Sequence, residues 1–395
     1  DDEDVAEAKG VPTFRYKIVA FALSAGIAGA VGGIHAMYVG FLTVGGTFEL
    51  TVPLYVVLMS VLGGSRHWFG PAVGATVITA LLYAFISGGE AMIGRALVGA
   101  ILIIAILWLP DGVVPAVQKW LRRQRVAGAG ASATAMPAEL VPVELAPTKP
   151  VGQRNILEAR TVTKRFGGLQ ALDGVDLDVR EGEILGLVGP NGSGKTTLIN
   201  VISGHFPLTS GTIAVDGVQI GHLPAHEIAG RGVARTYQIP RPFANMTVLD
   251  NVTLAATFGG PARPAAEMRD EAVHWIGFTG LAGKEAALPA ELNLHERKFL
   301  ELARALAARP KLLLLDEVLS GLNPAEIDNA IRLVRAIRAQ GATIVFVEHL
   351  MRAVVELSDR VAVLNEGKLF ALGAPRDVMR DPRVISIYLG KAYAA

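Results

Sequence analysis

The first third of this 395-residue chain is almost free of charge. Between Tyr16 and Gln118 the charged side chains are Lys17, Glu49, Arg66, Glu90, Arg95 and Asp111. A soluble domain carries charge at about a quarter of its positions. Charged groups are costly inside a bilayer, where the backbone must also satisfy its own hydrogen bonds, so this region is expected to form membrane-spanning helices.

Four apolar stretches are candidates for these spans. A spanning helix needs about 20 apolar residues. The stretches cover residues 17–43, 50–62, 68–87 and 96–109, and the second is short and carries Pro53. That second stretch is either a broken span or a re-entrant segment. We expect four spans.

The basic residues outside these stretches predict the orientation. Before the first span lie Lys9, Arg15 and Lys17, and between the second and third lies Arg66. After the last span come Lys119, Arg122, Arg123 and Arg125. The other loops hold Glu49 and Glu90, although Arg95 lies on the less favourable side. By the positive-inside rule both ends are cytoplasmic, which an even number of spans requires. The sequence therefore predicts a multi-pass protein of the cell (inner or plasma) membrane.

The rest of the chain is a linker and a second domain. Residues 126–153 are rich in Ala, Pro, Gly and Thr, which is typical of a flexible tether. From residue 154, short β-rich runs alternate with helical patterns, and 183–188, 312–315, 343–347 and 361–364 are predicted strands. This alternation predicts an α/β domain with a parallel sheet over residues 154–395. The fold class is thus multi-domain: an α-helical transmembrane segment at 1–125, then an α/β domain.

A phosphate-binding motif follows the first of these parallel strands. The run Gly189-Pro190-Asn191-Gly192-Ser193-Gly194-Lys195-Thr196-Thr197 contains G-x-x-x-x-G-K-[ST] between a predicted strand and a predicted helix. Glycines let successive N–H groups face phosphate oxygens, and the helix presents its positive end to them. We expect Lys195 to reach the outer phosphates of ATP and Thr196 to hold Mg²⁺.

Acidic residues end a second buried strand. Four leucines, 312–315, precede Asp316 and Glu317. Because ligands bind at the carboxyl edge of a parallel sheet, both carboxylates are expected beside the phosphate loop. We assign Asp316 to the metal and Glu317 to the general base, and place His349 near the γ-phosphate or the attacking water.

In this order, the motifs make residues 155–390 resemble an ATP-binding cassette (ABC) subunit, an α/β P-loop NTPase. The resemblance implies that Gln238 is the Q-loop glutamine, touching the metal and assisting catalysis, and that Phe166 stacks on adenine. Ser320-Gly321-Leu322-Asn323 stands at the D-loop. It also implies a second cassette, with two ATP molecules held between the two.

Two further segments resemble branched-chain amino acid importers in particular. They are the run Arg235-Thr236-Tyr237-Gln238 with Phe243 and Met246-Thr247-Val248, and the end of the chain from Asp381-Pro382 to Leu389-Gly390. Residues 1–120 are similar to the C-terminal part of the matching permease, with Glu7, Ala8 and Gly10 in the cytoplasmic loop that docks onto the ATPase. Such permeases have more spans upstream, so we expect this chain to be part of a longer whole. The implied partners are a further permease subunit, an extracytoplasmic solute-binding protein and membrane lipid.

The signature motif departs from the family pattern. Leu-Ser-Gly-Gly-Gln maps onto Leu292-Asn293-Leu294-His295-Glu296, so a side chain stands where glycine allows close approach to the nucleotide of the opposite subunit. Lys195, Thr196, Glu317 and His349 are all present, so we expect the partner cassette to be a different chain and the two sites to be unequal.

Other classes of protein fit less well. Past Val151, 27 basic residues face 26 acidic ones, so a ribosome- or DNA-acting ATPase lacks a basic surface and we expect no nucleic-acid partner. The chain has no cysteine, which excludes thiol catalysis and Cys-based metal sites. An exporter half-transporter shares the order membrane domain then ATPase, but its helices extend far into the cytoplasm. A urea or short-amide importer stays open as an alternative, because the sequence does not identify the solute.

Overall fold

The computed structural model describes residues 2–40, 51–65, 67–86, 99, 103, 108, 112–117, 151–260 and 264–389. It divides into two compact units. The first combines residues 1–20 with 137–395, and the second comprises residues 21–136. Residues 126–150 of the predicted linker lie outside the described residues. The same is true of Arg66, Arg95 and the basic residues between 119 and 125.

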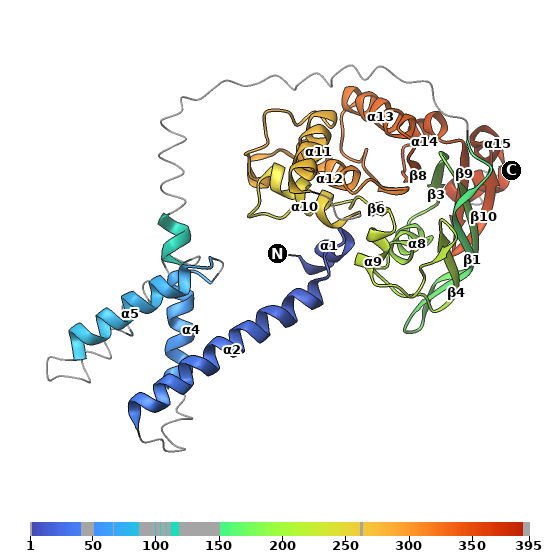
Figure 1. Cartoon of the computed structure of the whole chain (residues 1–395). Helices are drawn as coiled ribbons and strands as arrows, with labels where there is room; N and C mark the ends of the chain where they lie inside the picture. The colour runs from blue at the N-terminus through green and yellow to red at the C-terminus, as the bar shows by residue number, and fades with distance from the viewer. Residues whose placement is uncertain are drawn as a thin grey trace. The chain divides into compact units, whose positions relative to one another are not determined.

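Two sheets form the centre of the first unit (Figure 1). The antiparallel sheet has the order β2-β1-β4-β5, with β1 Asn155–Phe166, β2 Leu169–Arg180, β4 Ser210–Val215 and β5 Val218–Gln219. The six-stranded sheet has the order β10-β9-β3-β8-β7-β6, built from β3 Ile184–Val188, β6 Val233–Arg235, β7 Leu312–Asp316, β8 Thr343–Val347, β9 Arg360–Asn365 and β10 Lys368–Gly373. All its pairings are parallel except β9 with β10. The predicted parallel strands are therefore confirmed to within one residue at each end.

Alternate residues of the parallel strands supply two hydrophobic cores. On β7, Leu312 and Leu314 join the core shared with the antiparallel sheet and α8 (Lys195–Ile202), whereas Leu313 and Leu315 join the opposite core. Every residue of β3, β7 and β8 is buried. A strand covered on both faces needs apolar residues at every position, which explains the run of four leucines.

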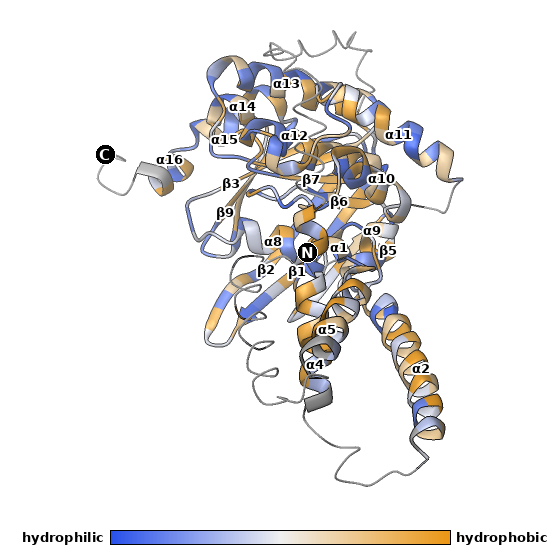
Figure 2. Cartoon of the chain, turned by 90° about the vertical axis from the view of Figure 1, so that its left-hand side faces the viewer, coloured by the Kyte–Doolittle hydropathy of each residue, from blue (hydrophilic) through white to orange (hydrophobic). Residues whose placement is uncertain are grey.

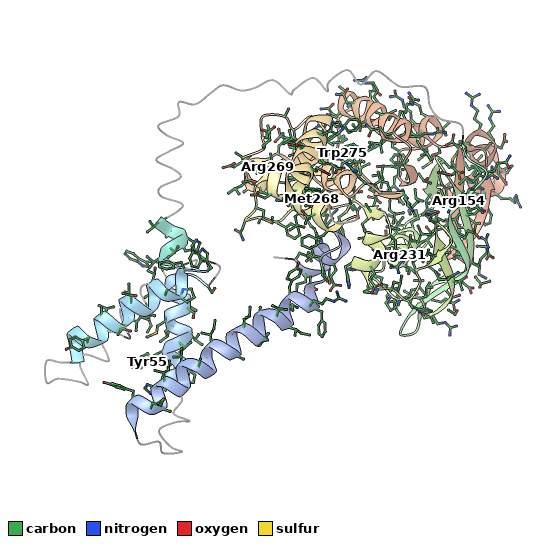
Figure 3. The ribbon with its side chains drawn as sticks, in the orientation of Figure 1. Tyr55, Arg154, Arg231, Met268, Arg269 and Trp275 are labelled. Atoms are coloured by element: carbon green, nitrogen blue, oxygen red, sulfur yellow. The ribbon has the colours of Figure 1, made fainter. Side chains whose placement is uncertain are left out.

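Helices cover the other face of the six-stranded sheet. Those packed in that core are α10 Val248–Phe258, α11 Ala265–Phe278, α12 Leu294–Ala307, α13 Pro324–Ala339, α14 Met351–Leu357, α15 Pro375–Arg380 and α16 Pro382–Leu389. Of these, α10, α11 and α12 pack on one another, and Met268, Arg269 and Trp275 mark α11 in Figure 3. The short α9 (Ala225–Gly230) lies by the antiparallel sheet, and a 3₁₀ turn at Pro289–Glu291 precedes α12.

The N-terminal helix α1 (Glu3–Ala8) belongs to the first unit. It lies beside α9, more than 200 residues away along the chain (Figure 1). The side chain of Asp2 caps it by accepting a hydrogen bond from the N–H of Val5, and Val5, Ala8, Lys9 and Gly10 are buried. The start of the chain thus packs against the α/β unit and belongs to it.

Apolar helices form the described part of the region predicted to span the membrane. Helix α2 (Thr13–Val39) is mostly orange in Figure 2, and its residues 13–38 form the only described helix that is long and apolar enough to cross a membrane. Shorter apolar helices follow, α4 (Thr51–Gly63) and α5 (Gly70–Ile86). These three helices coincide with the first three predicted spans. The fourth, 96–109, lies almost wholly outside the described residues, so the count of four spans stays a prediction.

Glycines bring α4 and α5 into close contact. A methyl group built on Gly63 would lie 1.7 Å from the carbonyl oxygen of Gly70, and one on Gly74 would lie 1.8 Å from that of Met59. Leu62 and Ile78 are buried next to this contact. Small residues at such a crossing allow the backbones to approach and pack tightly. By contrast, no described atom lies within 4 Å of that position for Gly26, Gly29, Gly32 and Gly33 of α2.

Candidate active site

The phosphate loop joins β3 to α8. Gly189, Gly192 and Gly194 have φ of 151°, 79° and 103°, which are unfavourable for residues with a side chain. Two of them also touch neighbouring backbone, since a methyl group on Gly189 would lie 2.2 Å from the Leu364 oxygen and one on Gly194 2.7 Å from the Ala171 oxygen. The glycines are therefore required both by the turn and by the packing around it.

Two polar side chains of this loop suit a phosphate ligand. The Lys195 ammonium donates to the carbonyls of Gly189 (2.8 Å) and Pro190 (3.0 Å), folding over the loop. The hydroxyl of Ser193 is buried and has no hydrogen-bond partner among the described residues. Burial lowers the pKa of Lys195, while Glu317 and Asp316 oppose that effect. Asn191 and Thr196 are exposed at the same loop, and Thr197 is half-buried.

Asp316 ends β7 in a buried position next to a cation. Its carboxylate lies 3.7 Å from the guanidinium of Arg235, and its backbone N–H donates to the hydroxyl of Thr236 at 3.1 Å. Burial raises the pKa of Asp316, and Arg235 is the main influence that lowers it. The Arg235 guanidinium also donates to the Asn200 side chain at 2.6 Å, which connects β6 to α8. Sequence reasoning missed the pairing with Asp316 because 81 positions separate the two residues.

Glu317 is brought together with His349 and Gln238. Its backbone has φ of 49°, a left-handed conformation that is uncommon for a residue with a side chain. One carboxylate oxygen lies 2.6 Å from His349 Nε2, and the other accepts a hydrogen bond from the Gln238 amide. The three residues follow the carboxyl ends of β7, β8 and β6, so adjacent strand ends of the parallel sheet assemble the cluster.

The loop that follows Glu317 is held from two sides. Lys298 of α12 donates its ammonium to the carbonyls of Glu317 (3.4 Å), Val318 (3.5 Å) and Ser320. On the other side, the buried Glu348 carboxylate accepts a hydrogen bond from the Leu319 N–H at 2.7 Å. Burial raises the pKa of Glu348 and lowers that of Lys298. Neither Lys298 nor Glu348 was predicted from the sequence. The one available signal was that Glu348 is a charged residue next to His349.

Phe166 lies at the turn between β1 and β2 and is partly exposed. Its ring meets that of Phe206 edge to face, with centroids 5.1 Å apart, and the Lys164 ammonium lies 4.8 Å from its centroid. Ala171, farther along the same hairpin, touches Gly194 of the phosphate loop. The hairpin therefore presents an exposed aromatic face near the loop. Phe206 and Lys164, which support that face, were not predicted.

The signature segment caps α12. The Asn293 side chain accepts from the N–H of Glu296 at 2.9 Å, and the Glu296 carboxylate accepts from the N–H of Asn293 at 3.0 Å. Glu296 also pairs with Lys284. His295 turns onto Phe299, with ring centroids 4.3 Å apart, and lies 3.7 Å from Glu326. The unusual side chains thus form hydrogen bonds and packing contacts with their own helix and with neighbouring residues.

The segment containing α1 reaches a buried charged cluster. The Lys9 ammonium lies 2.9 Å from the carboxylate of Glu301 and donates to the Arg235 carbonyl at 3.1 Å. The second oxygen of Glu301 accepts from Arg304 at 2.8 Å. The next residue, Gly10, has φ of 94°, and a methyl group there would lie 2.1 Å from the Phe258 oxygen. Breaking such a buried ion pair by removing one partner typically costs about 3–5 kcal/mol.

Comparison with known proteins identifies the family. The family model described as ABC transporter matches residues 172–320, and the model described as branched-chain amino acid transport system / permease component matches residues 1–106. The high-affinity branched-chain amino acid transport ATP-binding protein BraF of Pseudomonas aeruginosa is 38% identical over 253 residues, covering 60% of this chain and 99% of that protein. The chain belongs to the ABC transporter family.

Other relatives agree with this assignment. The ATP-binding protein LivG of Escherichia coli K12, named for the same transport, is 36% identical over 251 residues, covering 60% of this chain and 98% of that protein. Among solved structures, the ADP conformation of an ABC transporter cassette matches with a TM-score of 0.56 at 31% identity, covering 60% of this chain and all of the other. A nucleotide-free cassette matches with a TM-score of 0.55 at 29% identity and the same coverage. The α/β unit is therefore an ABC ATPase cassette that binds nucleotide, on a chain that also carries permease sequence and associates with a membrane.

Proposed function

We propose that this chain couples ATP hydrolysis in its cassette to import of branched-chain amino acids through a membrane permease. One observation carries the proposal: the Glu317, His349 and Gln238 cluster lies at the strand ends of a chain that also matches a permease family model. The names of the cassette relatives supply the solute class. A urea or short-amide importer is the alternative to be tested.

The phosphate loop holds ATP in this proposal. The N–H groups of the loop and the start of α8 bind the phosphates, and Lys195 exchanges its two carbonyl acceptors for phosphate oxygens. The buried hydroxyl of Ser193, which lacks a hydrogen-bond partner within the described part of the chain, gains one at the same time. Phe166 stacks on the adenine ring. The full binding set is Phe166, Gly189, Asn191, Gly192, Ser193, Gly194, Lys195, Thr196 and Thr197.

The residues also fit Mg²⁺. Thr196, Gln238 and Asp316 offer a hydroxyl, an amide oxygen and a carboxylate, which are the hard oxygen ligands that this ion prefers. Mg²⁺ takes its other ligands from phosphates and water, so a protein cage is not needed. When bound, it neutralises charge on the transferred phosphoryl group. Burial beside Arg235 keeps Asp316 fixed in position for this role.

Glu317 then acts as the general base. Its carboxylate is held by His349 and Gln238, and movement of either residue frees an oxygen to accept a proton from water. Lys298 and Glu348 fix the backbone on which Glu317 stands. His349 is placed to contact the γ-phosphate or the attacking water. Gln238 would touch the metal, and it follows the strand on which Lys9 docks.

The whole transporter contains further subunits. A second cassette, which we propose is a different chain, completes the nucleotide sandwich, while another permease subunit and an extracytoplasmic solute-binding protein complete the path. We propose four spans within residues 1–125, a linker at 126–153 and a cytoplasmic cassette at 154–395. Closure of the cassettes moves the docked segment and switches the membrane helices between two states.

Direction of transport provides the test. The chain is co-expressed with its permease and cassette partners, reconstituted in liposomes with the cassettes outward, and supplied with binding protein inside. Labelled leucine should leave the lumen toward the cassette side only with MgATP. ATP-driven movement into the lumen would indicate an exporter, and transport of urea but not leucine would contradict the proposed solute.

A further inference from the structure

Lys9 is the one buried cation of the docking segment, which we define as residues 2–11. Its side chain is 2% exposed, whereas Asp4, in the helix α1 that Lys9 follows, is exposed. Burial removes an ammonium group from water, and this cost is recovered only where a carboxylate and hydrogen-bond acceptors replace the water. Glu301 at 2.9 Å and the Arg235 carbonyl at 3.1 Å recover part of this cost.

The surroundings of Lys9 are otherwise cationic. The guanidinium groups of Arg304 and Arg235 both act on it, and Glu301 is the carboxylate that opposes them. Glu301 is 1% exposed and shares its second oxygen with Arg304, which is fully buried. Without Glu301, Lys9 would lose its carboxylate partner while the guanidinium groups of Arg304 and Arg235 remain nearby. The docking surface therefore contains a buried site for one positive charge, which Glu301 balances.

The pair also joins two elements that lead toward the candidate active site. Glu301 lies on α12, the helix whose N-terminus is capped by the signature residue Asn293. The Arg235 carbonyl that Lys9 contacts belongs to the residue whose guanidinium lies 3.7 Å from Asp316. One ammonium group thus bridges the signature helix and the strand that leads to Gln238.

We propose that the ion pair between Lys9 and Glu301 is the specificity determinant by which this docking segment recognises its cassette. A cassette with no carboxylate at position 301 rejects the segment, because Lys9 would be buried against Arg304 and Arg235. This inference deepens the proposed function by naming how the permease part selects its ATPase. Specificity here comes from an unpaired charge in the wrong complex.

A single cysteine reports docking in this cysteine-free chain. Val5 is fully buried in the docked helix, so Val5→Cys is protected from a maleimide while the segment is docked. Asp4→Cys, on the exposed side, gives the unprotected rate. The assay uses the detergent-solubilised full chain without nucleotide. It needs no transport, so a failure of the import proposal leaves the readout intact.

Variants at Lys9 test the pair without changing the cassette. Lys9→Glu sets two carboxylates against each other and should raise labelling of the cysteine at position 5 by about tenfold. Asp4→Lys, a charge reversal on the exposed side of the same helix, should leave it unchanged. Protection that persists in Lys9→Glu would overturn the proposal.

A double-mutant cycle separates the ion pair from general loosening. Glu301→Gln should raise labelling about tenfold when Lys9 is present, but much less when Lys9→Met has removed the cation. ATP binding by each variant verifies that the cassette remains folded. An equal effect of Glu301→Gln in both backgrounds would show that the two residues act independently, and the proposal would be wrong.

Discussion

At the residue scale, the site depends on groups whose partners lie far away along the chain. Glu317 holds a left-handed backbone conformation, and its carboxylate is shared between Gln238 and His349. Its loop is kept in place by Lys298, from α12, and by Glu348, the residue after β8. The general base is therefore positioned by residues from two other segments of the cassette.

Lys298 provides a prediction at this scale. Lys298→Met keeps the length of the side chain but leaves three carbonyls without their donor. We expect the loop to shift and kcat for ATP hydrolysis to fall about tenfold or more, with little change in ATP affinity. Lys298→Arg, which keeps the donors, should recover part of the rate. A loss of affinity with kcat intact would contradict a positioning role.

Lys195 provides a second prediction. Its side chain contacts carbonyls of its own loop and belongs to neither hydrophobic core. Lys195→Ala should abolish ATP binding, measured by equilibrium filtration, and leave the unfolding temperature within a few degrees of that of the parent. Retained ATP binding would mean that the loop does not hold the outer phosphates.

At the element scale, the sequence predicted what depends on local pattern. The buried strands, the glycine turn and the two acids after β7 follow from apolar runs and spacing, because a strand covered on both faces must be apolar. Lys298, Glu348 and Arg235 were not predicted, since their roles arise from contacts between elements that no local pattern records. Lys9 was missed for the same reason: next to Glu7, Ala8 and Gly10 it looked like one of several basic residues before a span.

The docking segment should respond to pH. Burial and the nearby arginines outweigh the attraction of Glu301 and lower the pKa of Lys9 from 10.5 to about 8. Between these values the undocked segment binds more protons than the docked one. Docking should therefore strengthen as pH rises from about 8 toward 10.5, by up to about 1.4 kcal/mol per pH unit, and change little below pH 8.

The measurement is protection of a cysteine at position 5 relative to one at position 4, because this ratio cancels the pH dependence of the thiol itself. Lys9→Met should remove the dependence on pH. If protection fell as pH rose through this window, or if Lys9→Met behaved like the parent, the titration would not belong to Lys9.

At the scale of the whole molecule, a single chain combines permease sequence with an ABC cassette. The resemblance to the family predicted this combination. The low charge of the first third predicts membrane spans, but it does not show that they belong to a permease. The unusual signature has its main consequence here. Asn293 and Glu296 cap their own helix, and His295 packs on Phe299. If this segment contacts the nucleotide of a partner cassette, as the family resemblance implies, a defect in it would affect that site.

We therefore predict two unequal ATP sites in a heterodimer. With the candidate partner cassette co-expressed, Glu317→Gln should remove most ATPase activity, whereas the equivalent change in the partner should remove little. The check is the steady-state hydrolysis rate of each singly disabled assembly. Equal losses would indicate two matched sites.

The central claim, that Glu317 is the base of a working ATPase, is tested most directly by single-turnover hydrolysis of bound ATP. The wild-type assembly is compared with one carrying Glu317→Gln, at matched occupancy by MgATP. The amide keeps the shape of the side chain but cannot accept the proton. We predict unchanged ATP binding and a rate about 100-fold lower or more. Hydrolysis within twofold or so of the wild-type rate would contradict the account.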